Sequence, residues 1–265
     1  MLKIKEYVKA ESLEEAYQLN QKKKNCILGG MLWLKMGSRT IQTAIDLSGL
    51  GLDKIEETEE AFSIGCMTTL RQLEKHEGLE KLTQGAIRQS VESIVGVQFR
   101  NLATVGGSIF GRFGFSDVLT CFLALDTYVE LYHGGIMPLE EFAAAKKDRD
   151  ILVRLIVKKT PVHCVYMSHR NTRTDFPVLT CAVSEDGRGV RAVVGARPGR
   201  AVCIRLEEDS LEGGLDENLD AAAEGLAAQV TTGSNMRAGA SYRSVLAKVL
   251  IRRGLCRLLE ERGIS

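Results

Sequence analysis

The sequence lacks a surplus of either charge and lacks a long apolar run. Its 35 Lys and Arg residues face 34 Asp and Glu residues, so the chain has no long-range positive field of the kind that draws proteins to nucleic acid or anionic membranes. No stretch approaches the roughly 18 apolar residues of a membrane-spanning helix, and the charged first residues do not resemble a signal peptide. We therefore expect a cytoplasmic protein that neither binds nucleic acid nor spans a membrane.

The sequence also lacks clustered metal ligands. Its 7 cysteines lie far apart and form no C-x-x-C pair, the local spacing that most zinc and iron-sulfur sites use. The 4 histidines are equally scattered, and there is no G-x-S-x-G motif of the hydrolase type. We expect reduced, mostly buried cysteines, no metal ligands and no catalytic acid, base or nucleophile.

The amino-terminal part alternates short strands with helices. Residues 2–8 have the pattern of a strand, and Ser12 with Glu15 forms a capping box at the start of a helix expected over 12–24. We expect Lys22–Lys24, in the last turn of that helix, to complement its dipole rather than to bind phosphate. Next come Cys26–Leu28, apolar like a buried strand, and Gly29-Gly30. A strand that leads into a glycine turn is the first feature that suggests a ligand site.

The pattern changes near residue 160. Before it, strands and helices mix: strands are expected over 43–50 and 61–65, helices over 68–76 and 81–91, and a helix running into a strand over 117–133. After it, strands follow one another and two helices close the chain: strands at 166–169, 176–184, 189–195 and 200–206, helices at 217–230 and 241–263. The interruption at Lys159–Pro161 marks a domain boundary, and the fold class is α+β.

Two Gly-Gly pairs are candidates for holding a phosphate. One lies in ILGGMLWL at 27–34 and the other in NLATVGGSIFG at 101–111. Glycine lets backbone N–H groups approach a diphosphate closely, although a Gly-Gly pair after a strand can also be only a tight turn. Neither pair fits the G-x-G-x-x-G fingerprint, so a Rossmann dinucleotide site is not supported.

The second glycine segment resembles the flavoprotein subunits of molybdenum hydroxylases, the xanthine dehydrogenase and carbon monoxide dehydrogenase type of enzyme. Those proteins carry R-N-x-A-T-x-G-G-N/S, then S-D and an apolar helix that ends L-x-A-L-D. Here the motif stands as RNLATVGGSI at 100–109, followed by Ser116-Asp117 and FLALD at 122–126. SIGCMTTL at 63–70 resembles the family's I-G-A-x-T-T-L turn, and the resemblance continues to the carboxyl end through RNTRTDFPVLTCAV, GARPGRAV and ASYRSVLAKVLIRRGL.

The resemblance implies a two-part FAD-binding region of the vanillyl-alcohol oxidase-like, PCMH type, followed by a smaller α+β domain of strands covered by helices. The expected divisions are 1–56 and 57–159 for the two FAD-binding subdomains and 160–265 for the carboxyl-terminal domain. One loop would wrap the FAD diphosphate: Ile27, Leu28, Gly29, Gly30, Met31, Leu32 and Trp33. The second would form the opposite wall: Thr104, Gly106, Gly107, Ser108 and Ile109. Asp117 would bond the ribose or the flavin, and its alternative role is to cap the helix that follows.

Two positions depart from the family pattern. Met31-Leu32 replace a polar pair, so the first loop would have to bind phosphate through backbone N–H groups alone. Met167 stands where many relatives have a lysine near the flavin, and His169 or Arg170 would have to supply a positive charge there.

The expected function is electron transfer. The chain would take electrons from a two-iron two-sulfur ferredoxin-like small subunit, which serves a molybdopterin-binding large subunit, and would pass them through FAD to NAD or another acceptor. Two alternatives stay open at this point: a free-standing FAD-dependent oxidase or dehydrogenase of the vanillyl-alcohol oxidase type, and an assembly subunit without flavin.

Overall fold

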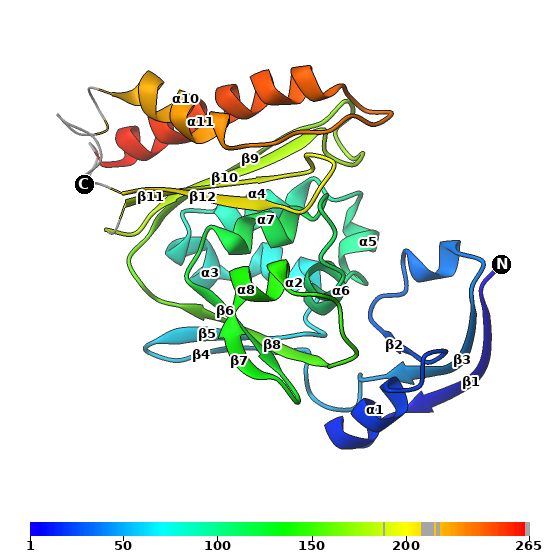
Figure 1. Cartoon of the computed structure of the whole chain (residues 1–265). Helices are drawn as coiled ribbons and strands as arrows, with labels where there is room; N and C mark the ends of the chain where they lie inside the picture. Colours follow the sequence, from blue (N-terminus) through cyan, green and yellow to red (C-terminus); the bar gives the residue numbers. More distant parts are fainter. Residues whose placement is uncertain (188, 208–214, 216–217, 263–265) are drawn as a thin grey trace. The chain divides into compact units, whose positions relative to one another are not determined.

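The computed structural model describes residues 1–187, 189–207, 215 and 218–262. The chain forms two compact units: unit 1 comprises residues 1–72, 97–111 and 127–158, and unit 2 comprises 73–96, 112–126 and 159–265. We describe each unit by itself. Two sheets belong to unit 1 and one to unit 2 (Figure 1). Each of the three expected divisions thus contains the greater part of one sheet, and the division into subdomains itself stays a prediction.

A three-stranded parallel sheet forms the amino-terminal part of unit 1. Its strands lie in the order β1-β3-β2 and span Lys3–Lys9 (β1), Cys26–Leu28 (β2) and Thr40–Asp46 (β3). Helix α1 (Leu13–Asn20) packs on β3 and begins at Ser12, whose hydroxyl accepts from the Glu15 N–H as the capping box predicts. A short 3₁₀ turn, η1 (Leu34–Met36), leads from the first glycine loop towards β3.

Helix α1 ends earlier than expected. It stops at Asn20, and Lys22–Lys24 follow in a turn instead of occupying the last helical turn, which holds no basic residue. The prediction that these lysines complement the dipole from within the helix is therefore wrong. The reason is a distant residue: the Arg149 guanidinium donates to the carbonyls of Asn20, Lys22 and Asn25 and so satisfies groups that a continuing helix would have used.

The second sheet of unit 1 has five antiparallel strands in the order β4-β5-β8-β6-β7. They span Ile55–Glu57 (β4), Ala61–Gly65 (β5), Thr127–Leu131 (β6), Gly135–Pro138 (β7) and Leu152–Lys158 (β8). Helix α8 (Leu139–Ala144) packs on β6 and β7, and helix α6 (Val105–Phe110) packs on β5 and β8. A single turn of helix, α5 (Val97–Arg100), precedes α6. The central strand β8 therefore supports the helix that carries the second glycine pair.

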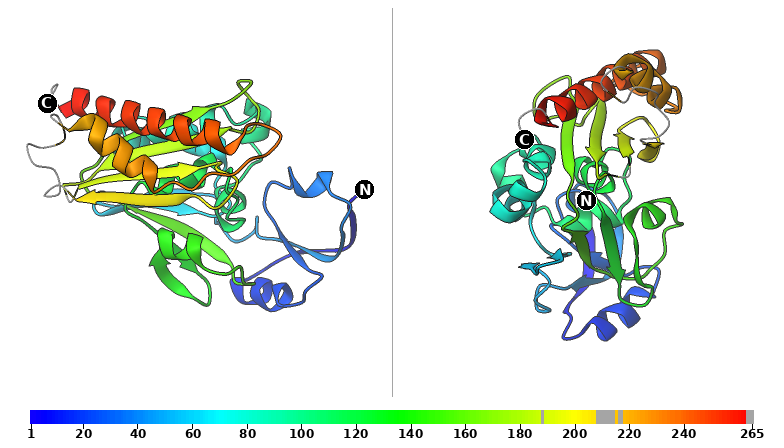
Figure 2. Two further views of the ribbon diagram at one scale, coloured as in Figure 1. Left: turned by 45° about the horizontal axis from the view of Figure 1, so that its top comes forward. Right: turned by 90° about the vertical axis from the view of Figure 1, so that its left-hand side faces the viewer.

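Unit 2 is a four-stranded antiparallel sheet with helices on both faces (Figure 2). Its order is β12-β11-β10-β9, with strands at His163–His169 (β9), Leu179–Glu185 (β10), Gly189–Gly195 (β11) and Val202–Glu207 (β12). Helices α10 (Leu219–Ala228) and α11 (Ala240–Arg262) cover one face, whereas α4 (Ala86–Glu92) and α7 (Asp117–Leu123) contact the other.

The sequence of β10 shows why both faces are covered. Every residue of this strand is buried, and alternate side chains point to opposite faces. Leu179, Cys181 and Val183 join the apolar core beneath α10 and α11. On the other face the Thr180 and Ser184 hydroxyls contact Thr120 and the Ala124 carbonyl, so the face towards α7 is the polar one.

Two further helices, α2 (Leu70–Lys75) and α3 (Glu77–Leu82), precede α4. The continuous helix expected over 81–91 is interrupted between α3 and α4, because Gln84 and Gly85 have left-handed φ values of 46° and 84°. The expected ends of the last two helices, Glu217 and Gly263, lie outside the described residues. The α+β class is confirmed, and no helix within the described residues is long and apolar enough to cross a membrane.

Candidate functional site

The two glycine turns meet inside unit 1. A Cβ atom built on Gly29 would lie 2.7 Å from the Thr104 Oγ1 atom and 3.9 Å from the Gly107 Cα atom. One built on Gly30 would lie 1.9 Å from the Leu102 carbonyl oxygen, which no real side chain tolerates. The first turn thus rests directly on the backbone of the second, and segments far apart in the sequence form one surface.

The second turn is hydrogen-bonded to the segment that follows β5. The Gly106 N–H donates to the Cys66 carbonyl at 2.7 Å and the Val105 N–H donates to the Thr68 carbonyl at 2.8 Å. Thr104 caps α6, because its hydroxyl oxygen accepts from the Gly107 N–H at 3.2 Å. The turn SIGCMTTL therefore has a structural role, since it fixes the start of α6.

The glycines serve two different purposes. Gly30 and Gly106 lie against protein backbone, since a Cβ on Gly106 would come within 2.8 Å of the Cys66 carbonyl oxygen. Gly107 is different, because its built Cβ would meet only the Thr104 hydroxyl, at 3.2 Å. Its open side can accept close approach by a ligand. The Thr104 hydroxyl, which donates to no acceptor among the described residues, can offer its hydrogen there.

The first loop presents backbone rather than polar side chains. Met31 has a left-handed φ of 58°, an uncommon conformation for a residue other than glycine and one that marks sites held in place by their surroundings. Its carbonyl accepts from the Lys35 N–H at 2.9 Å. Trp33 is 47% exposed and packs edge-on against Phe99, with 5.6 Å between ring centroids. This geometry fits a loop that meets a phosphate through N–H groups.

Met31 provides a test of this loop. Replacing it with valine should weaken FAD binding about fivefold to tenfold, because a β-branched side chain at positive φ costs about 1 kcal/mol more. Met31→Gly should bind FAD at least as tightly as the wild type, since glycine adopts this φ freely. Quenching of flavin fluorescence during titration measures both. Leu32→Val is the matched control, and an equal loss in it would show that the backbone conformation at Met31 is not the cause.

The remaining expected residues of the two turns are more enclosed. Ile109 is fully buried and Leu28 nearly so, so that only their backbone groups can face a ligand. Ile27 and Leu32 are partly exposed. The Ser108 hydroxyl donates to the Thr104 carbonyl at 3.1 Å within the helix. Both loops together offer glycine backbone, the Thr104 hydroxyl and an aromatic edge, a set that suits the diphosphate and planar ring of FAD.

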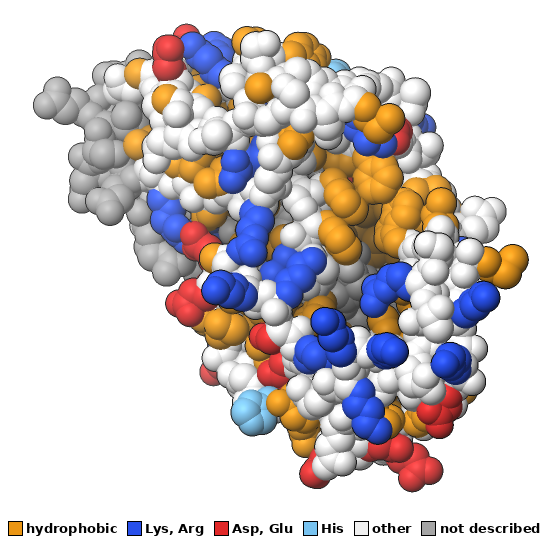
Figure 3. Space-filling view, turned by 45° about the vertical axis from the view of Figure 1, so that its right-hand side comes forward, with side chains coloured by type: hydrophobic (Ala, Val, Ile, Leu, Met, Phe, Trp, Pro, Cys, Tyr) orange, Lys and Arg blue, Asp and Glu red, His pale blue; other side chains and the backbone are white. Residues whose placement is uncertain are grey.

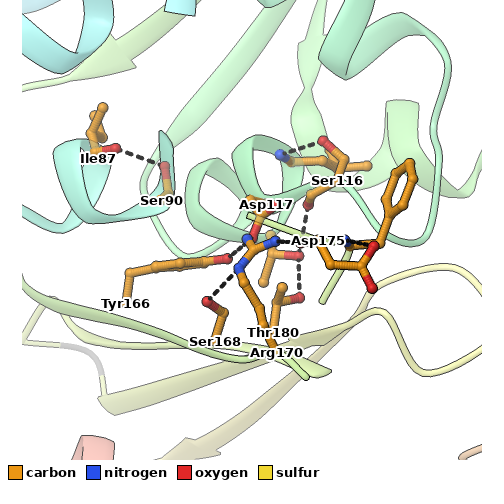
Figure 4. A network of polar contacts seen from close by, with 12 residues as sticks. Ile87, Ser90, Ser116, Asp117, Tyr166, Ser168, Arg170, Asp175 and Thr180 are labelled. Carbon is orange, nitrogen blue, oxygen red and sulfur yellow. Dashed lines mark hydrogen bonds and ion pairs between the residues drawn. The ribbon is translucent and has the colours of Figure 1, made fainter. Parts of the chain in front are cut away.

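Asp117 belongs to unit 2 and takes part in a buried network (Figure 4). It is the first residue of α7, and the cap is Ser116, whose hydroxyl accepts from the Leu119 N–H at 3.1 Å. The alternative role of Asp117 as the helix cap is therefore wrong. Its carboxylate accepts from the Tyr166 hydroxyl at 2.6 Å and forms an ion pair with Arg170.

Burial dominates the electrostatics of this network. It raises the pKa of the Asp117 carboxyl, although Arg170 and Tyr166 hold that pKa down. Burial also raises the pKa of Tyr166 well above its ordinary value. Arg170 further donates to the Ser168 Oγ atom at 3.3 Å and to the Asp175 carbonyl oxygen. Its guanidinium group is therefore engaged by residues of unit 2. His169, the other expected source of positive charge, lies 3.2 Å from the Tyr242 hydroxyl.

Sequence reasoning did not find Tyr166 as the partner of Asp117. The available signal was the alternation of Tyr166, Ser168 and Arg170 along and just beyond β9, which places all three on the polar face of the sheet. The carboxylate that Tyr166 and Arg170 contact, Asp117, lies in a distant part of the sequence. All 7 cysteines are free thiols, and the described residues contain no group of side chains that could hold a metal ion.

Comparisons with known proteins give the same picture of the fold. The chain is 24% identical over 258 residues to uncharacterized protein YgfM of Escherichia coli K12, covering 94% of each chain. Among solved structures, a carbon monoxide dehydrogenase chain from Hydrogenophaga pseudoflava matches with a TM-score of 0.81 and 21% identity, covering 94% of this chain and 95% of that one. A quinoline 2-oxidoreductase chain from Pseudomonas putida 86 matches with a TM-score of 0.80 and 17% identity, covering 98% of both.

The family comparison goes further than the fold. The family described as FAD binding domain in molybdopterin dehydrogenase matches residues 2–160, which include both glycine turns and both sheets of unit 1. This confirms the resemblance that the motif at 100–109 indicated. The chain belongs to the family of FAD-binding domains of molybdopterin dehydrogenases, an oxidoreductase family of the molybdenum hydroxylase class whose cofactor here is FAD.

Proposed function

We propose that this chain is the electron-transfer subunit of a molybdenum hydroxylase, holding FAD between electron donor and final acceptor. The observation that carries the proposal is the meeting of the two glycine turns, in which Gly29 and Gly107 converge on the Thr104 hydroxyl while Gly107 keeps an open side. A ligand with a diphosphate and a planar ring suits this surface, and family membership supplies its identity as FAD.

In this proposal the residues of the two turns orient the cofactor. Gly29, Gly30, Met31 and Leu32 would meet the diphosphate through backbone N–H groups, and Thr104, Gly107 and Ser108 would meet it from the other side. Asp117 would contact the ribose or the flavin with its second carboxylate oxygen. FAD supplies the capacity to take electrons one at a time and to release them as a pair. The chain's own residues bind and position it, and none acts as a catalytic acid or base.

The chain transfers electrons between two partner subunits and a final acceptor in this proposal. Electrons arrive from a two-iron two-sulfur small subunit, which takes them from a molybdopterin-binding large subunit where substrate is oxidised. They leave to NAD or another acceptor, and the complex works in the cytoplasm. The support is the covered length: this chain matches nearly the whole of single chains from a carbon monoxide dehydrogenase and a quinoline 2-oxidoreductase. Two enzymes named for different substrates thus contain chains of this fold.

The free-standing oxidase is the second candidate, and rapid mixing separates the two. The FAD-loaded chain alone, mixed with candidate heterocycles or aldehydes, should show no flavin bleaching on a catalytic time scale, because in this proposal the substrate is oxidised on the molybdopterin-binding partner. Adding the two partner subunits should make the flavin reducible by substrate. Rapid bleaching of the flavin without partners would establish the free-standing oxidase instead, and a folded chain that takes up no flavin would point to an assembly subunit.

A further inference from the structure

One surface of unit 1 concentrates positive charge on two loops that are distant in the sequence. The turn after α1, residues 21–25, carries Lys22–Lys24, and the loop before β8, residues 146–149, carries Lys146, Lys147 and Arg149. We call these six residues the basic patch. Asp148 is the only acid in the two segments. The face drawn in Figure 3 shows several Lys and Arg side chains across its middle and lower part, with Asp and Glu side chains along its lower edge.

A set of hydrogen bonds fastens the two loops together. The Arg149 guanidinium donates at 2.9 Å to the carbonyls of both Lys22 and Asn25, and also to the Asn20 carbonyl. In the opposite direction, the side-chain amides of Asn20 and Gln21 donate to the Arg149 carbonyl at 2.8 and 3.1 Å. The backbone under the lysines is thereby fixed before any partner arrives, which lowers the entropy lost on binding.

Four of the five lysines in the basic patch are free of ion pairs within the described part of the chain. Arg149 already satisfies the carbonyls at the end of α1, the usual role of cations at that position. Lys22–Lys24 and Lys146 are exposed and form no ion pair with any described residue. The whole chain has a formal net charge of only +1, so the rest of the molecule is acidic relative to this patch. Such asymmetry orients the approach of a partner of opposite charge.

Aromatic side chains adjoin the basic patch and favour a protein partner. Tyr17 lies one helical turn before Gln21, whose amide donates to the Tyr17 carbonyl at 3.1 Å. Its ring stacks on His133, with 5.5 Å between centroids and an interplanar angle of 8°, and lies 5.4 Å from Tyr132. Tyrosine and arginine are enriched at protein interfaces, whereas the lysines around them supply charge that steers the approach of a partner. Because Tyr17 and His133 already stack on each other, neither offers two free faces to a nucleic-acid base.

We propose that the basic patch docks an acidic face of a partner subunit in the electron-transfer complex. The inference rests on the proposed function, which requires such a complex, and adds the surface that steers the subunits together. Association should therefore be fast at low salt and should weaken as salt rises, since screening shortens the reach of the patch.

The test compares two triple variants of the FAD-loaded chain with the purified partner subunits. In the first variant, K22E/K23E/K24E reverses the charge of the turn after α1. In the matched control, K54E/K75E/K81E makes the same change at exposed lysines elsewhere. Association rates and dissociation constants are measured by surface plasmon resonance at several salt concentrations. We expect about 100-fold weaker binding of the first variant at low salt, mainly through slower association, a flatter salt dependence, and less than about threefold change in the control.

Other outcomes have distinct meanings. If the wild type binds the partners and the first variant matches the control, the docking surface is wrong while the proposed function stands. If the wild type binds neither partner, the proposed function fails and this inference falls with it. Retention of short single-stranded DNA or phosphatidylserine vesicles by the wild type, lost in the first variant while subunit binding is unchanged, would assign the patch to a polyanion and overturn the proposal.

Discussion

Replacing Gly107 with aspartate should abolish FAD binding. The built Cβ of Gly107 meets only the Thr104 hydroxyl, at 3.2 Å, so the new side chain would occupy the open side where the proposed diphosphate lies. A carboxylate there adds like-charge repulsion to steric exclusion, and about a thousandfold or greater loss of affinity is expected. The flavin-to-protein ratio of the purified variant, measured by absorption after release of the cofactor, should fall from one to near zero.

Two comparisons separate loss of the cofactor from loss of the fold. Gly239→Asp adds the same carboxylate at a glycine whose built Cβ meets nothing within 4 Å, and it should keep its flavin. Gly30→Ala should instead unfold unit 1, because its Cβ would lie 1.9 Å from the Leu102 carbonyl oxygen. A folded Gly107→Asp protein with full flavin content would remove Gly107 from the site.

Replacing Arg170 with methionine should strongly destabilise unit 2. The ion pair with Asp117 is almost fully buried, with 7% and 6% of the two side chains exposed. Removing the cation leaves a buried carboxylate that still accepts from the Tyr166 hydroxyl but has lost the positive charge of Arg170. A loss of about 3–5 kcal/mol in the free energy of unfolding is expected at neutral pH. Urea denaturation of wild type and variant measures it, and the exposed Arg173→Met serves as the control.

The same variant has a predictable pH dependence. Arg170 lowers the pKa of Asp117 against the larger raising effect of burial, so its removal raises that folded-state pKa further. The folded variant then gains protons on acidification at a higher pH than the folded wild type, and protonation stabilises it relative to the wild type. The difference in stability should be greatest near neutral pH and should shrink as the pH falls through the raised pKa. A difference independent of pH would show that packing, rather than the uncompensated carboxylate, causes the loss.

Elements with a strong local pattern could be predicted from the sequence. Strands over 61–65 and 189–195 have the expected bounds, because β-branched and apolar residues end abruptly at glycine or charged residues. The helix expected over 12–24 was too long, since the contact that ends it comes from Arg149. The strand β8 was not found at all, although its residues 152–158 are largely buried.

The candidate site, like the fold, could be predicted from the sequence only in part. The glycine pairs were visible in the sequence, and the family motif linked them to FAD. Gly30 and Gly106 serve packing while Gly107 stays open because of tertiary contacts that the local sequence does not show: the decisive neighbours are the carbonyls of Leu102 and Cys66. Likewise, no local pattern shows that Asp117, at the start of helix α7, is bonded to Tyr166 on strand β9 and to Arg170 just after that strand.

We expect this chain to hold one FAD noncovalently in the paired glycine turns. The most direct measurement is the flavin content of the purified, folded chain after incubation with FAD and removal of the excess by gel filtration. We expect one FAD per chain in the wild type, released intact on denaturation, and none in Gly107→Asp. A folded wild-type chain that emerges without flavin would contradict this expectation.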